Sequence, residues 1–222
     1  LAGAVGTGTH GTGPGLGNIS STVDAVRLVD ADGEIHSYSA ETDRDLLRAL
    51  RVSLGSLGVF SALRLRLTPA YRLHERVRRL PVDACLERLH EEIAQSRHFE
   101  FFCPPHKDVA EMKTLVPTDE ELSELPDLPY ERIGWSARIL PSERDVKFFE
   151  MEYAVPAEQG PQCFREVRAH IQEHHSDVLW PVEYRTVAAD DAMLSNAHGR
   201  ETVTISVHQD GSLPYREFFE SV

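Results

Sequence analysis

The sequence has few cysteines, no long apolar run and a shortage of positive charge. Its 222 residues include three cysteines, Cys85, Cys103 and Cys163. Their odd number and wide spacing match neither a disulfide framework nor a zinc motif, so we expect reduced thiols and a cytoplasmic protein. No stretch approaches the roughly 20 apolar residues of a membrane-spanning helix, and we expect no membrane span.

Basic side chains are outnumbered by acidic ones. The chain has 23 Lys and Arg against 36 Asp and Glu, a formal net charge of -13, which argues against a nucleic-acid partner. An acidic stretch from Thr118 to Glu124 precedes Pro126 and Pro129, and we expect a solvated loop there. The hydrophobic content of 41% is enough for one sizeable core or two smaller ones. These features predict a soluble globular protein.

A glycine-rich segment, Gly6-Thr-Gly-Thr-His-Gly-Thr-Gly-Pro-Gly-Leu-Gly-Asn18, lies near the start of the chain. Glycine tolerates positive φ and lets a ligand approach the main chain, and the threonine hydroxyls add hydrogen-bond donors. Such a lining suits phosphate. The alternative is a glycine-rich connection that binds nothing.

Two familiar phosphate-binding motifs do not fit this segment. Gly6-x-Gly8-x-x-Gly11 satisfies the dinucleotide fingerprint, and Asp30 and Asp32 follow at about the spacing of a ribose-binding acid. The fingerprint must lead into a helix, however, and the helix-breaking residues 14–18 follow instead. A Walker loop is excluded because the segment has no Gly-Lys-Ser/Thr.

Alternating and helical patterns divide the chain into two parts. In the first part we expect a hairpin of strands 22–29 and 34–38 around a turn at 30–33, a helix over 43–50 and a strand over 59–67 that Pro69 ends. Along the last strand the alternation predicts a solvent-exposed face with Arg64 and Arg66 and a buried face opposite it. The buried face is formed by Val59, Ser61, Leu63, Leu65 and Leu67.

The second part repeats one order of elements. Strand 73–80, helix 82–97 and strand 99–103 precede the acidic stretch, and strand 147–155, helix 161–175 and strands 182–187 and 202–209 follow it. Two such β-α-β units predict an α+β fold, with an antiparallel sheet and helices on one of its faces.

Glu183 and Arg185 lie two residues apart on one of these strands. They therefore project to the same face, opposite Val182, Tyr184 and Thr186. A carboxylate beside a guanidinium can bind and orient a polar substrate. The alternative is a surface salt bridge worth roughly 0–1 kcal/mol.

One histidine pair has the spacing of a metal motif. His170-Ile-Gln-Glu-His174 fits His-x-x-Glu-His, an inverted zinc-protease pattern. The buried stripe of the helix is expected at Phe164, Val167 and Ile171, which places His170 and Glu173 on the solvated flank. We therefore expect no metal site.

Several segments together resemble the vanillyl-alcohol-oxidase superfamily. Gly6–Gly13, the hairpin turn 30–33 and Leu54-Gly-Ser-Leu-Gly-Val59 resemble, in that order, the second half of its PCMH-type FAD-binding domain. Residues 181–185 and 190–195 resemble the substrate-domain segment of the sugar-lactone and alditol oxidases, among them the L-gulonolactone and D-arabinonolactone oxidases. The resemblance implies that residues 1–71 are the C-terminal part of an FAD-binding domain. Residues 72–222 would be the substrate, or cap, domain, incomplete at its C-terminus.

The resemblance implies an FAD-dependent oxidase or dehydrogenase acting on a CH–OH group of a sugar lactone or polyol. Hydride would pass to the flavin and then to oxygen or another acceptor. Glu183 and Arg185 would be the catalytic pair that binds substrate. The implied cofactor-binding residues are Thr7, Gly8, Thr9, His10, Gly11, Thr12, Gly13, Ile19, Gly55, Gly58 and Val59.

Some of these assignments have alternatives. Gly55 and Gly58 are also what a plain strand entry would need. The family's Pro-rich loop, flavin-linking histidine and His-Trp-Gly-Lys lysine are not among residues 1–222, so we expect an internal piece of a longer enzyme and assign no general base. Other interpretations are a non-catalytic fragment or FAD-binding module, and a superfamily relative acting on a non-sugar alcohol. Only Trp135 and Trp180 could supply tryptophan to an aromatic pocket.

Overall fold

The computed structural model describes residues 1–121, 123–124, 130–141 and 145–222, which form two compact units. The first unit comprises residues 1–11, 15–69 and 187–201, and the second comprises 12–14, 70–186 and 202–222. The change of unit at 69–70 lies near the expected boundary at residue 71. Two segments do not follow this boundary: residues 12–14 belong to the second unit, and residues 187–201 belong to the first.

The first unit is built on a three-stranded antiparallel sheet of order β2-β1-β3. Its strands are β1 (Val23–Val29), β2 (Ile35–Ser39) and β3 (Val59–Leu65), and its helices are α1 (Ala2–Gly6), the 3-10 turn η1 (Ile19–Thr22) and α2 (Arg44–Arg51). The expected hairpin and helix are confirmed. A 3-10 turn, and not an α-helix, follows the glycine-rich loop, which agrees with the rejection of the dinucleotide fingerprint. The core of the unit comprises Val5, Val23, Val26, Leu28, Leu47 and Leu50.

The expected burial pattern of β3 is wrong in part: Leu63 and Leu65 pack against the core and Arg64 and Arg66 are exposed, as expected, but three other positions differ. Val59 and Leu67 are 71% and 87% exposed, Ser61 is also exposed, and Phe60 packs against the core instead. The register against β1 shifts by one residue between Phe60 and Ala62. Such a bulge breaks the strict alternation of a strand, so the faces read from the sequence are interrupted at this point.

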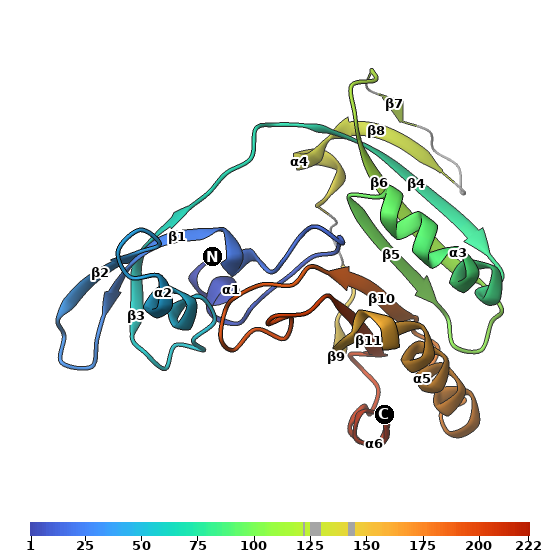
Figure 1. The fold of residues 1–222 in the computed structure, drawn as a ribbon. Coiled ribbons are helices and arrows are strands. Elements are labelled where there is room, and N and C mark those ends of the chain that lie inside the picture. The colour runs from blue at the N-terminus through green and yellow to red at the C-terminus, as the bar shows by residue number, and fades with distance from the viewer. Residues whose placement is uncertain (122, 125–129, 142–144) are drawn as a thin grey trace. The chain divides into compact units, whose positions relative to one another are not determined.

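The second unit contains an eight-stranded sheet of order β7-β8-β4-β6-β5-β10-β11-β9 (Figure 1). The strands are β4 (Arg72–Leu80), β5 (His98–Cys103), β6 (Ala110–Thr118), β7 (Ser123–Glu124), β8 (Glu131–Trp135), β9 (Phe148–Pro156), β10 (Val182–Val187) and β11 (Thr202–Asp210). The helices are α3 (Val82–Gln95), the short α4 (Ser136–Ile139), a 3-10 turn η2 (Ala157–Gln159), α5 (Gly160–His174) and α6 (Arg216–Ser221).

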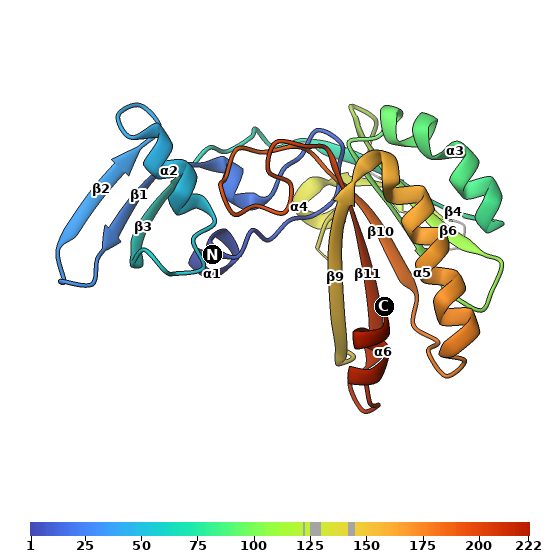
Figure 2. The same ribbon diagram turned by 60° about the horizontal axis from the view of Figure 1, so that its bottom comes forward.

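Both expected β-α-β units are present, and each is split by a further strand. β6 lies between β4 and β5 and is antiparallel to both, while β11 lies between β9 and β10. Helix α3 packs on β5 and β6, and α5 packs on β9 and β11, on the same side of the sheet (Figure 2). Both helices contribute to one core with the sheet. The α+β prediction is confirmed.

Two strands were not expected. β6 carries Glu111, Lys113 and Pro117, and β8 is five residues long, so neither shows a strong apolar alternation. The expected acidic loop is wrong in part: Thr118 ends β6, and Ser123–Glu124 forms β7 on the edge of β8. Residues 122 and 125–129 of that region, which include Pro126 and Pro129, lie outside the described residues.

None of the helices in the described ranges is long and apolar enough to cross a membrane. Cys85, Cys103 and Cys163 are free thiols, as expected, and the first two are buried. Burial raises the pKa of the Cys85 thiol to about 12, so this thiol is protonated and unreactive at neutral pH.

Candidate active site

Glu183 and Arg185 lie on the face of the sheet opposite the helices. Tyr184 between them points into the helix-covered core, where its ring stacks on Phe101 at 4.8 Å between centroids. The same-face prediction for Glu183 and Arg185 is therefore confirmed. Arg185 Nη2 lies 3.1 Å from Glu183 Oε2, and the Glu183 side chain is only 4% exposed. This burial distinguishes the pair from a surface salt bridge.

Two further carboxylates from the edge strand β9 surround Arg185. Arg185 Nη2 lies 3.3 Å from Glu150 Oε1 and 3.0 Å from Glu152 Oε2, and the Ser206 hydroxyl on β11 donates a hydrogen bond to Glu152. Sequence reasoning missed Glu150 and Glu152. Their spacing of two residues was a usable signal, but only the placement of β11 between β9 and β10 brings them to Arg185.

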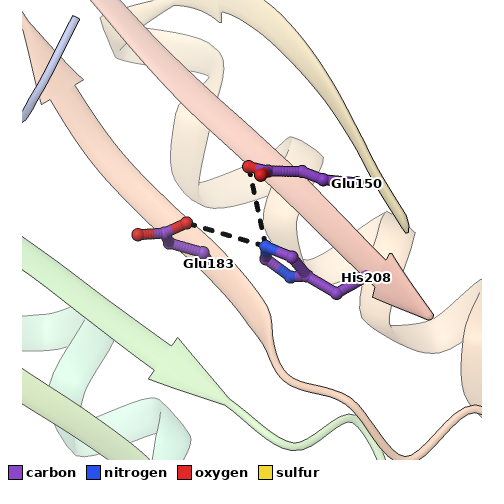
Figure 3. Close-up of side chains that lie close together, drawn as sticks. All are labelled: Glu150, Glu183 and His208. Carbon is purple, nitrogen blue, oxygen red and sulfur yellow. Dashed lines mark ion pairs between the residues drawn. The ribbon is translucent and has the colours of Figure 1, made fainter. Parts of the chain in front are cut away.

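His208 completes this group and was also missed. Its Nε2 lies 3.6 Å from Glu150 Oε1 and 3.8 Å from Glu183 Oε2 (Figure 3). Its Nδ1 lies 2.8 Å from the carbonyl oxygen of Pro181. The ring is 3% exposed. Only its register opposite Glu150 in the β9–β11 pair identifies it as a site residue.

The two carboxyls respond differently to their surroundings. The interaction with the neighbouring His208 imidazole lowers the pKa of Glu150, which burial alone would raise. Burial raises the pKa of Glu183, although Arg185 opposes this effect. Glu183 is therefore the carboxyl of this group that takes up a proton more readily.

Glu150, Glu183 and His208 are also the one metal-like trio found in the described part of the chain, with potential ligand atoms within 4.8 Å of one another. Arg185 contacts both carboxylates and supplies a positive charge between them. The arrangement is thus explained without a metal.

The motif His170 to His174 forms no such trio among the described residues, and His170 Nε2 instead lies 3.0 Å from the Ser221 hydroxyl.

Charges of alternating sign continue across the sheet from this group. Glu100 on β5 lies opposite Arg185 in the β5–β10 register. Lys113 Nζ on β6 lies 3.1 Å from Glu100 and 3.4 Å from the fully buried Glu75 on β4, which also pairs with Arg132 on β8. Burial disfavours the charged amine, but the Glu100 and Glu75 carboxylates outweigh it and raise the pKa of Lys113. We call this set the charged row; its members, in the order of the strands, are Arg132, Glu75, Lys113, Glu100 and Arg185.

Three buried polar atoms on the same sheet face have no hydrogen-bond partner within the described residues. They are Arg185 Nε, His98 Nε2 and Thr204 Oγ1. Buried polar atoms in folded proteins are almost always paired with protein, water or ligand. Each of these atoms can therefore bind a polar ligand on this face.

Residues 12–14 of the glycine-rich loop belong to the same unit and bind next to Arg185. Gly13 N donates to Thr186 O at 2.7 Å, and Thr186 N donates to the Thr12 hydroxyl at 3.2 Å. Thr12 also hydrogen bonds to the carbonyl oxygen of Phe99, and its own carbonyl lies 2.8 Å from His98 Nδ1. Thr12 and Gly13 are thus fixed to β5 and β10 within two residues of Arg185.

The other predicted cofactor residues, Thr7 to Gly11, Ile19, Gly55, Gly58 and Val59, lie in the first unit. Ile19 N donates to Thr9 O at 2.8 Å, which brings Ile19 to the loop. A Cβ at Gly11 would meet nothing within 4 Å, so the backbone is accessible there. Leu54, Leu57 and Val59 on the nearby turn are exposed apolar side chains. An open glycine backbone and an exposed apolar turn are compatible with a large, flat, phosphate-bearing ligand.

A buried asparagine anchors the end of the loop. The Asn18 side chain donates to Asp190 Oδ2 at 2.7 Å and to the Ser195 hydroxyl at 2.9 Å, and it caps η1 by accepting from Ser21 N. This network holds residues 187–201, the excursion that follows Arg185, against the first unit to which they belong.

A profile of the D-arabinono-1,4-lactone oxidase family matches residues 63–134 and 127–222, well over half of the chain. The chain belongs to this family. Its relatives include the L-gulono-1,4-lactone dehydrogenase of Mycobacterium tuberculosis, 32% identical over 100% of this chain and 60% of that protein. L-gulonolactone oxidase of Mus musculus is 26% identical over 93% of the chain and 56% of its own length. Alditol oxidase of a Streptomyces species is 30% identical over 92% and 55%.

The fold of this family member is also similar to solved structures. A cholesterol oxidase from Brevibacterium sterolicum, a His121Ala mutant, superposes with a TM-score of 0.77 at 13% identity, over 98% of this chain and 59% of that one. At this identity the likeness concerns the fold alone. The chain spans about 60% of the length of the mycobacterial relative.

Proposed function

We propose that the chain is part of an FAD-dependent oxidoreductase that oxidises a CH–OH group of a sugar lactone or polyol. The observation that carries the proposal is the buried Glu183–Arg185 pair on the polar face of the sheet, where Arg185 Nε is a further donor with no partner among the described residues. The family relatives named for gulonolactone, arabinonolactone and alditols support the substrate class. A cytoplasmic location stays a prediction based on the three free cysteines.

The pair has two separate tasks in this proposal. Glu183, when ionised, accepts a hydrogen bond from a substrate hydroxyl and so orients the carbinol. Arg185 stabilises negative charge that develops on the substrate oxygen or beside it, in a site where burial strengthens the interaction. FAD, when bound, supplies the acceptor for the hydride.

The residues proposed to hold FAD are those of the glycine-rich loop and the glycine-containing turn. Thr7, Gly8, Thr9, His10, Gly11, Thr12 and Gly13 would contact it through backbone N–H and hydroxyl groups, and Ile19, Gly55, Gly58 and Val59 would pack against it. The open backbone at Gly11 and the exposed Val59 fit this role. Gly58 fits it less directly, because its φ of +137° and the closeness of Val29 O already require glycine.

The proposal is tested with Arg185→Ala in the full-length protein that contains this chain. We expect the rate of flavin reduction by a polyol or sugar lactone under anaerobic conditions to fall by roughly 10²–10³-fold, as when one preorganised donor is removed. FAD content, measured by absorbance, should stay unchanged. Arg79→Ala is the matched control, because Arg79 lies in the same sheet but is 55% exposed and pairs only with Glu111 among the described contacts.

Two outcomes would contradict the proposal. Equal loss of FAD content and flavin reduction in Arg185→Ala would make Arg185 a structural residue. If no sugar lactone or polyol reduces the flavin of the unmodified protein, the interpretation as a non-catalytic FAD-binding module or as an oxidase of another alcohol replaces this one.

A further inference from the structure

Arg185 and His208 contact the same two carboxylate oxygens. Glu150 Oε1 lies 3.3 Å from Arg185 Nη2 and 3.6 Å from His208 Nε2, and Glu183 Oε2 lies 3.1 Å and 3.8 Å from the same two nitrogens. The four groups therefore form a closed ring in which basic and acidic groups alternate. Figure 3 shows His208 between the two carboxylates.

The position of the imidazole determines where its protons are. Nδ1 lies 2.8 Å from Pro181 O, and because a carbonyl oxygen can only accept, Nδ1 carries a proton. The other nitrogen faces Glu150 and Glu183. A bare lone pair there would oppose two carboxylates, whereas an N–H can donate to them, so the geometry favours the imidazolium.

The balance of charge around the ring points the same way. The three carboxylates of Glu150, Glu152 and Glu183 lie within 3.3 Å of a single guanidinium, that of Arg185. Glu100 on β5 adds a further negative charge that acts on Glu183, although Lys113 pairs with Glu100 at 3.1 Å. One cation does not compensate these acids, and a second cation next to Glu183 reduces their mutual repulsion.

The surroundings of His208 keep water from screening these interactions. The rings of Phe148 and Trp180 lie 5.6 Å and 6.5 Å from the imidazole ring, centroid to centroid. The charged groups that contact His208 are Glu150 from β9 and Glu183 from β10, and Arg185 and Glu152 lie one ion pair further away.

We propose that His208 is a positioning residue for the oxidation: as an imidazolium it is the second cation that keeps Glu183 ionised, so that Glu183 can accept the hydrogen bond of the substrate hydroxyl. The inference rests on the proposed function of Glu183. Burial favours the neutral form of this carboxyl, and Arg185 is shared among three carboxylates, so Glu183 depends on His208 for its charge.

The test is the pH dependence of kcat/KM for a sugar lactone or polyol in the full-length holoenzyme. His208→Gln keeps a similar size and an amide donor but removes the charge. We expect its acid limb to move to higher pH by roughly one unit, since an opposite charge at this distance shifts a carboxyl by about that much or more. Glu150→Gln removes a competing negative charge, and its acid limb should move to lower pH. His74→Gln is the control. His74 lies on β4, outside the ring, and pairs with Glu131 at 3.2 Å, so this variant should leave the acid limb in place.

A second measurement does not depend on turnover. Infrared difference titration of the same proteins follows the C=O band of a protonated carboxyl, assigned to Glu183 by its loss in Glu183→Gln. In His208→Gln this band should persist to higher pH than in the unmodified protein. His208→Lys, which restores a cation, should return the band toward its original pH range.

Unshifted acid limbs and an unshifted band in His208→Gln would overturn the inference and leave the proposed function intact. The inference also fails if kcat/KM falls by an equal factor at every pH, because a merely structural histidine behaves in that way. If no substrate is oxidised by the unmodified protein, the proposed function fails, while the infrared titration still decides whether His208 controls the charge of Glu183. Should His208→Gln not fold, the opposite shift expected in Glu150→Gln carries the test.

Discussion

Gly58 shows that one residue can satisfy both a structural and a functional interpretation of the sequence. Its φ is +137°, and a Cβ there would clash with Val29 O of the neighbouring strand. Gly55 also has a positive φ, +74°, but a Cβ there would meet nothing within 4 Å. The strand entry therefore requires glycine at 58 whether or not a cofactor binds, while position 55 requires it only for backbone conformation.

The two glycines give a prediction at this scale. In the full-length protein, Gly58→Ala should lower the free energy of unfolding in urea by about 2–4 kcal/mol, because backbone strain and overpacking add. Gly55→Ala should cost about 1 kcal/mol, since only the conformational penalty applies. A Gly58→Ala protein of normal stability that has lost its FAD would instead show that the position serves the cofactor alone.

Single residues also show where sequence reasoning stops. The spacing of Glu183 and Arg185 correctly predicted that both face the same side of β10. It could not predict Glu150, Glu152 or His208, because these reach the Glu183–Arg185 pair from other strands and no local pattern encodes strand order. The burial of Glu183 likewise depends on neighbours that are distant in sequence.

At the scale of elements, the polar face of the sheet has defined side-chain contacts, as its helix-covered core does. The charged row crosses β8, β4, β6, β5 and β10, and its member Glu75 is fully buried between Lys113 and Arg132. Such buried ionic groups add little net stability as a set, but losing one member leaves its partners uncompensated.

Removing Glu75 from the charged row should therefore lower the free energy of unfolding. Glu75→Leu leaves Lys113 and Arg132 with less compensation, and we expect a loss of about 3–5 kcal/mol in the free energy of unfolding, measured by urea denaturation. Glu111→Leu on the adjacent strand removes only the exposed pair with Arg79 and should cost less than about 1 kcal/mol. Similar losses in the two variants would mean that the row contributes no more than a surface pair.

The elements themselves were predictable where apolar alternation was strong. Strand 99–103 and both long helices were found within about two residues, because each places apolar side chains at the period of its element. Strand 73–80 was found equally closely, although the buried Glu75 interrupts the apolar alternation of Leu73 and Val77. β6 and β8 were missed because their polar face carries the charged row and the substitution of charge for apolar residues hides the alternation.

At the scale of the molecule, stability should depend on pH through His98. Burial lowers the pKa of His98 below its ordinary value of 6.5, although the hydrogen bond with Thr12 opposes this effect. The folded protein therefore binds fewer protons than the unfolded chain in the window just below pH 6.5, and stability is lost as the pH falls through it. The raised pKa of Glu183 has the opposite effect on stability: in the window just above its ordinary pKa of 4.5, stability is gained as the pH falls.

Thermal unfolding between pH 8 and pH 5.5 checks this expectation. The melting temperature should fall as the pH drops through 6.5, and the slope should be smaller in His98→Gln. His90→Gln, at an exposed position of α3, should keep the slope of the unmodified protein. An identical slope in all three proteins would exclude His98 as the source.

The sequence by itself determined the α+β class, the two β-α-β units, the shared face of Glu183 and Arg185 and the resemblance to sugar-lactone oxidases. These follow from local periodicity and from short motifs, which are properties of neighbouring residues. Only the tertiary structure decided the strand order, the bulge in β3, the burial of Glu183 and the ring formed with Arg185, Glu150 and His208. Those features depend on which distant strands pair and in which register, and a one-residue change of register would turn each of these side chains to the other face of the sheet.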